Sequence, residues 1–206
     1  MTSILKADTI QDTDGNNIIN ESGNTITIGA SGDTITIPAG ATIANSGTAT
    51  GFGETNTPAF DIRKNSYQTI SNATSTKVTL DVAALDTDSG FDSGNNRWTV
   101  PSGKAGTYYI AYSLFCDGGA NSNLEYADVN LAINGTAALS GITDFRSNNG
   151  RQSNITQQAV IALSVGDYLE LFGTISDSSG SPQFGGGSSG GEKYKTHISG
   201  FRIIAS

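Results

Sequence analysis

Hydrophobic and polar residues alternate with a period of two along most of the chain from residue 57 onward. The longest run is Thr107–Phe115, where one face carries bulky apolar side chains and the other a mixed set. We predict strands at Ala59–Arg63, Thr76–Leu80, Arg97–Pro101, Gly106–Phe115, Tyr126–Ile133, Ala137–Phe145, Asn154–Leu163, Tyr168–Ile175 and Tyr194–Ile204. Turn residues separate these segments at regular spacing, which is typical of an all-β sandwich.

The N-terminal part of the chain has a shorter repeat. Glycines at positions 15, 23, 32 and 40 are spaced by 8, 9 and 8 residues, and each precedes a short run rich in Ile and Thr. Burial of two isoleucines contributes roughly 1.5–3 kcal/mol each, which does not offset roughly 1–2 kcal/mol of backbone ordering for every residue of a unit. The units must therefore stack on neighbours. We predict three chains wound around one axis, with a single-chain β-solenoid as the alternative.

These patterns divide the chain into three parts. Residues 1–43 are predicted to form an attachment arm followed by the repetitive trimeric β-stalk, and residues 44–56, rich in Gly, Ser and Thr, a neck or linker. Residues 57–206 are predicted to form a sandwich domain, which we call the knob. The expected fold class is therefore all-β: a β-stalk followed by a jelly-roll knob.

Composition narrows the possible partners. The 206 residues carry a formal net charge of −8, with only 15% of residues charged, so we expect no nucleic-acid binding through a basic surface. No apolar run reaches the ~20 residues of a membrane helix, so no membrane insertion is expected. The N-terminus lacks the apolar core of a secretion signal. The single cysteine, Cys116, excludes an intrachain disulfide and is interpreted as a small buried hydrophobic residue.

Candidate catalytic and metal-binding residues are few. His197 is the only histidine and lies among apolar residues, so we interpret it as structural or surface-exposed. The residues Asp86, Asp88 and Asp92 have the spacing of half a calcium loop, but Arg97 stands where a bidentate glutamate is needed. A solvated turn is the favoured interpretation and a metal site the alternative. No cofactor and no enzymatic activity are predicted.

The knob resembles a known family. An aromatic-Thr-Val-Pro corner, a short turn with Gly103 and Gly106, and an Ala-Gly-x-Tyr strand start occur within Trp98–Tyr108. Four further landmarks stand in the same order along the chain as in that family: Pro58-Ala59-Phe60, the Asn-Gly hairpin of Leu131–Gly135, Leu163–Leu171 and Ser199–Ile204. Together they resemble the globular head of complement component one-q, which shares its jelly roll with tumour necrosis factor. The resemblance covers about residues 58–206 and implies a binding domain with threefold contacts.

A second resemblance covers residues 3–43. The amino-acid sequence from Ser3 to Ile43 resembles the N-terminal region of fibre and appendage proteins of tailed bacteriophages of marine bacteria. The resemblance implies a virion structural protein located on the particle surface, made in the host cytoplasm and joined to other virion proteins through residues 1–43. It leaves open whether the fibre belongs to the tail, the collar, the baseplate or the head.

The expected function is host attachment by a homotrimeric, non-enzymatic fibre whose knob contacts a surface glycan or protein. A trimeric binding module of cellular origin is the alternative, and a glycan depolymerase is a further one. Within the knob, the apolar strand face with Tyr108, Ile110 and Tyr112 is expected near the threefold axis. Receptor binding is predicted at two polar loops, Asp117–Asn123 and Ser176–Gly191, through Asp117, Asn121, Asn123, Tyr126, Phe184 and Tyr194. The alternative for Phe184 is that its ring caps its own sandwich.

Overall fold

A computed structural model describes residues 9–11, 13–14, 17–22, 25–29, 31–44, 46, 57–178, 180–186 and 195–205 of the chain. The chain forms two compact units, Met1–Phe52 and Gly53–Ser206. The described residues form strands and turns and contain no helix, so none of them belongs to a helix able to span a membrane.

In the first unit, β1 (Thr9–Gln11), β2 (Asn17–Ser22) and β3 (Thr25–Ile28) form an antiparallel sheet in chain order. The strands β2 and β3 pair with each other within the single chain, with Ile19 opposite Ile28. The predicted winding of three chains around one axis stays a prediction. The next repeat, Thr34–Ile37, forms no strand in the single chain. Its two isoleucines are exposed, as are those of β3.

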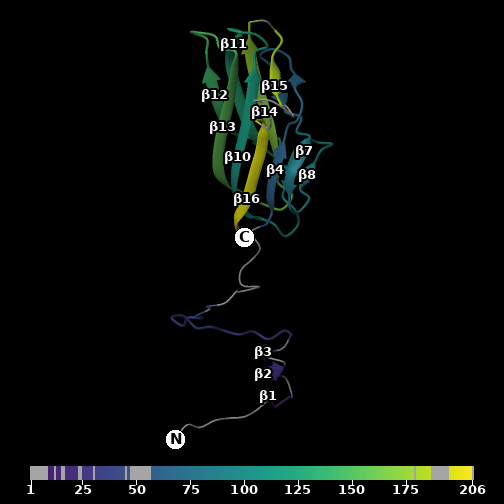
Figure 1. Ribbon diagram of the computed structural model, residues 1–206, viewed down its shortest axis with the longest axis vertical. Coiled ribbons are helices and arrows are strands. Elements are labelled where there is room, and N and C mark those ends of the chain that lie inside the picture. The colour runs from purple at the N-terminus through teal and green to yellow at the C-terminus, as the bar shows by residue number, and fades with distance from the viewer. Residues whose placement is uncertain are drawn as a thin grey trace. The chain divides into compact units, whose positions relative to one another are not determined.

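The second unit consists of two antiparallel sheets (Figure 1). In the first, which we call the β10 sheet, β10 (Gly106–Asp117) pairs along its whole length with β13 (Gln152–Leu163). On its other edge β10 pairs with β16 (His197–Ala205) and then with β15 (Gln183–Gly185). The sheet continues from β16 to β4 (Ala59–Arg63) and β7 (Val82–Asp86), and from β15 to β5 (Gln68–Thr69).

The second sheet, which we call the β11 sheet, has β11 (Leu124–Ile133) between β12 (Thr136–Asp144) and β14 (Tyr168–Asp177). Beyond β14 lie β9 (Arg97–Thr99) and β8 (Phe91–Asp92), and β6 (Thr76–Lys77) also pairs with β14. The sequence did not predict the short strands β5, β7, β8 and β15. The last of these lies inside the segment that was predicted to be a loop, Ser176–Gly191.

Glycine and asparagine residues adopt positive φ angles in the two predicted turns, between β9 and β10 and between β11 and β12. Gly103 and Gly106 have φ values of 72° and 156°, as expected for the turn between β9 and β10. Asn134 and Gly135 have φ values of 54° and 76° and join β11 to β12 in two residues, which is the geometry of a type I′ hairpin turn. The predicted Asn-Gly hairpin is therefore confirmed.

The core of the knob lies between the two sheets. Trp98 is its largest member: its ring stacks on Phe60 with centroids 3.9 Å apart and meets the edge of Tyr108 at 5.9 Å. Tyr108, Ile110 and Tyr112 belong to the same cluster and are at most 1% exposed in the single chain. One chain already buries these three side chains, so they offer no surface to a partner chain, and their position near a threefold axis stays a prediction.

Candidate functional site

The described parts of the two loops predicted to bind a receptor meet at Ser178 and Asn123. The hydroxyl of Ser178 donates a hydrogen bond to Asn123 Oδ1 at 3.2 Å, and its backbone N–H donates to the carbonyl of Asn123 at 3.0 Å. Asn121 is exposed in the first loop, whereas Asp117 is 8% exposed. The Asp117 carboxylate accepts hydrogen bonds from the Gly119 N–H and the Gln152 amide, both at 2.8 Å, so it holds its own loop together.

The aromatic residues assigned to this site are placed differently. Phe184 is in β15 opposite Cys116, and its side chain is fully buried. The expectation of an exposed Phe184 ring is therefore wrong. Because β15 pairs with β10, the Phe184 side chain points into the core between the two sheets. Tyr126 is in β11, where its hydroxyl donates to Asp128 Oδ2 at 3.2 Å and burial raises its pKa. Tyr194 lies outside the described residues.

The three aspartates considered as half of a calcium loop form hydrogen bonds and an ion pair within the protein. The carboxylate of Asp86 accepts hydrogen bonds from the Gly90 and Phe91 N–H groups and from the Trp98 indole. Asp88 pairs with Lys104, and Asp92 accepts from the backbone and side chain of Asn95. These carboxylates thus fix the β7–β9 turn, as the favoured interpretation expected. In the described ranges, no group of three or more His, Cys, Asp or Glu side chains is arranged around a common metal position.

Cys116 and His197 occupy structural positions. Cys116 is a free, fully buried thiol, and burial raises its pKa well above the usual range, so the thiolate is disfavoured. His197 is partly exposed in β16, where it lies between Arg63 of β4 and Ser113 of β10. The interpretation of both residues as structural or surface groups agrees with these positions.

The outer face of the β10 sheet carries a feature that the sequence analysis missed. Strand register places Val160 opposite Tyr109, and Tyr109 opposite Phe201, with the two ring centroids of the latter pair 5.5 Å apart. Ile204 lies opposite Thr107, which is two residues from Tyr109 along β10. Val160 and Ile204 are each 62% exposed and Phe201 is 40% exposed. We call Tyr109, Val160, Phe201 and Ile204 the apolar band.

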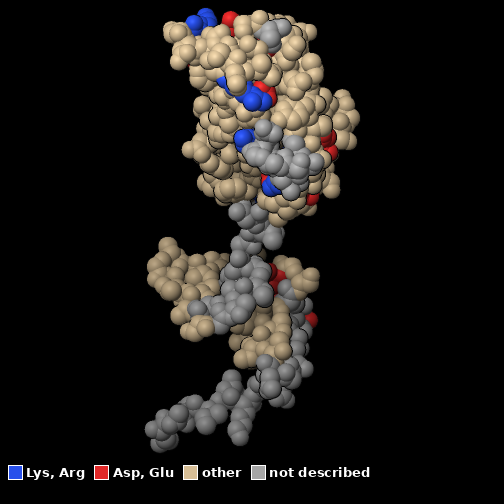
Figure 2. All heavy atoms as spheres, turned by 45° about the horizontal axis from the view of Figure 1, so that its top comes forward, with Lys and Arg blue, Asp and Glu red and all other residues tan. Residues whose placement is uncertain are grey.

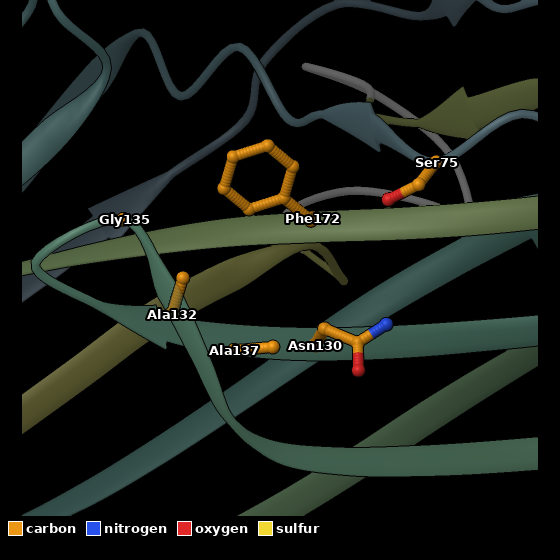
Figure 3. A pocket seen from close by; sticks show the side chains of 6 residues that line it. All are labelled: Ser75, Asn130, Ala132, Gly135, Ala137 and Phe172. Carbon is orange, nitrogen blue, oxygen red and sulfur yellow. The ribbon is translucent and has the colours of Figure 1, made fainter.

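The outer face of the β11 sheet contains a hollow of about 300 Å³. Its lining residues come from β11, β12, β14 and the segment before β6, and they are Ser75, Asn130, Ala132, Gly135, Ala137 and Phe172 (Figure 3). Phe172 lies opposite Asn130 in the sheet and next to it on the same face. Phe172 is an aromatic residue at an outward position of its predicted strand, and this is the signal by which the sequence could have indicated the hollow.

The sandwich defines a class of protein fold: an all-β, antiparallel jelly roll. Among solved structures, the chain is similar to the globular domain of zebrafish complement 1qA protein, with a TM-score of 0.51 and 16% sequence identity. The similarity covers 73% of this chain and 100% of that domain. The complement-head fold predicted for the knob is therefore confirmed, and at this identity the similarity shows the fold alone. The sequence matches no protein-family model and no curated protein.

Proposed function

We propose that this protein is a homotrimeric, non-enzymatic attachment fibre whose knob contacts a surface and whose N-terminal residues anchor it. The apolar band carries the proposal. Tyr109, Val160, Phe201 and Ile204 lie on the neighbouring strands β13, β10 and β16 on the outer face of the β10 sheet, and contiguous apolar patches mark interaction surfaces. A second and third copy of the chain would cover them in a closed trimer, and closed symmetry is the rule among homo-oligomers.

The stalk sequence supports the same assembly. Ile26, Ile28, Ile35, Ile37 and Ile43 are 46–67% exposed in the single chain. Their spacing follows the glycine repeat, so neighbouring copies would bury them in register. The resemblance of residues 3–43 to bacteriophage fibre proteins supports a virion as the setting, since a free binding module needs no such anchor. This supports a fibre over a binding module of cellular origin.

The surface of the knob is compatible with recognition by neutral groups. On the face in Figure 2, lysine, arginine, aspartate and glutamate are sparse and most of the described knob surface is uncharged. The net charge of −8 also disfavours a polyanionic partner. A glycan or protein on a host surface is the partner that we propose.

The assembly is tested by sedimentation equilibrium of the full chain. We expect a trimer at micromolar concentration, and Phe201→Arg should shift the mass toward smaller species because a buried, unpaired guanidinium is strongly unfavourable. The matched control is Ile142→Arg, since Ile142 is 64% exposed on the other sheet. A monomeric wild type, or equal dissociation of both variants, would contradict the proposed interface.

The anchoring role is tested by deleting residues 1–43. The shortened chain should retain the β-sheet circular dichroism of the knob, because the knob is a compact unit of its own. It should also fail to enter particles when supplied in place of the full chain during particle assembly. Normal incorporation of the shortened chain would show that the knob, rather than the N-terminus, makes the anchoring contact.

A further inference from the structure

The hollow of the β11 sheet exists because three small residues border a large one. Ala132 of β11, Gly135 of the hairpin turn and Ala137 of β12 leave space beside the Phe172 ring of β14 (Figure 3). The Phe172 side chain is partly exposed, although Leu171 and Gly173 on either side of it are buried. The volume of the hollow, about 300 Å³, is at the lower end of the range for small-ligand sites, roughly 300–1,000 Å³, so one ring-sized group fits.

Polar groups converge on the same space. The Asn130 side chain is oriented by a hydrogen bond that its Nδ2 donates to Asp128 Oδ1 at 2.9 Å. Within the described residues, no hydrogen bond reaches Asn130 Oδ1, so this acceptor remains available. The exposed hydroxyl of Ser75, which lies across the hollow, can donate or accept. The residues that carry the aromatic ring, the amide and the hydroxyl therefore all line one hollow.

The charged residues near the hollow are already engaged. Lys77, which lies beside Phe172 in the sheet, forms an ion pair with Glu170 and donates to the carbonyl of Asn95. The carboxylate of Asp128 accepts hydrogen bonds from Asn130 and Tyr126. A charged ligand would find no unpaired counter-charge among these groups, so the arrangement favours a neutral one.

We propose that this hollow binds one neutral pyranose unit of a glycan. The apolar C–H face of the sugar packs on the Phe172 ring, one hydroxyl donates to Asn130 Oδ1, and another exchanges a hydrogen bond with Ser75. The hollow lies on the opposite sheet from the apolar band, so it stays open when the band is covered. This inference rests on the proposed role of the knob as the part that contacts a surface.

The test is saturation-transfer difference NMR of the full chain with the methyl glycosides of glucose, galactose, mannose and N-acetylglucosamine. The methyl glycoside of N-acetylneuraminic acid serves as the charged comparison. At least one neutral sugar should give signal, strongest for the protons on one face of the ring. Phe172→Ser should weaken that binding at least tenfold, and Ala137→Leu, which fills the hollow without removing a contact, should do the same.

The control is Ile142→Ser, which removes an exposed apolar side chain of β12 that does not line the hollow and should leave binding unchanged. Circular dichroism and sedimentation of each variant separate a loss of sugar binding from a loss of fold or of trimer. Absence of signal with all four neutral sugars, equal binding by Phe172→Ser and wild type, or preference for the charged sugar would overturn the proposal. A trimer that binds no sugar would leave the assembly intact, so the two proposals fail independently.

Discussion

Replacing Trp98 by alanine should lower the free energy of unfolding of the knob by about 3–5 kcal/mol, the usual cost of truncating a large buried aromatic side chain. The Trp98 side chain is 1% exposed and lies between the rings of Phe60 and Tyr108, so its removal leaves a cavity between the sheets. The lost hydrogen bond to Asp86 is a smaller part of the effect, because that carboxylate keeps the Gly90 and Phe91 donors. Urea denaturation followed by far-ultraviolet circular dichroism measures the change.

Trp98→Phe is the matched comparison. It retains a ring against Phe60 and loses the indole N–H, so a smaller cost of about 1–2 kcal/mol is expected. All variants must be compared at one protein concentration, because the unfolding of the trimer that we propose would depend on concentration. If Trp98→Ala cost less than about 1 kcal/mol, the stacked cluster would not be the centre of the core.

Gly106→Ala is the second change with a large expected effect. A Cβ atom built at position 106 would lie 2.2 Å from the carbonyl oxygen of Ile204 and 3.0 Å from Arg202 Cδ, and the residue has a φ of 156°. The first contact is with backbone, which cannot move without breaking the pairing of β10 with β16. Strain and overlap together should destabilise the knob by about 3 kcal/mol or more, measured as a lower urea midpoint.

Gly166→Ala separates backbone strain from overlap. Gly166 has a φ of 86°, and a Cβ atom there would meet nothing within 4 Å. Its substitution should therefore cost only the positive-φ penalty, roughly 1 kcal/mol. Equal losses for the two alanine variants would show that the close approach of β10 and β16 contributes nothing measurable.

The strands and corners of the knob could be predicted because their signals are local. The alternation in Thr107–Phe115 identified a strand whose bulky face is the core face, and the Asn134-Gly135 pair identified a hairpin, since both depend on residues that are adjacent in the chain. Short strands such as β15 were missed because two or three residues carry too little pattern to distinguish from a loop. Their strand conformation comes from partners distant in sequence, here Phe115–Asp117 of β10.

The sequence by itself determined that the protein is all-β, that its N-terminal repeat exposes apolar side chains, and that the longest strand has a bulky apolar face. Only the tertiary structure decided what covers each face. Tyr108, Ile110 and Tyr112 are buried by the second sheet of their own chain. Tyr109, Val160, Phe201 and Ile204 instead form the apolar band on the outer face. Phe184 is core and Phe172 lines a hollow, although both are single aromatic residues near glycines. The period-two alternation of a strand predicts which side chains share a face. The packing of strands distant in sequence decides whether that face contacts the core, a partner or solvent.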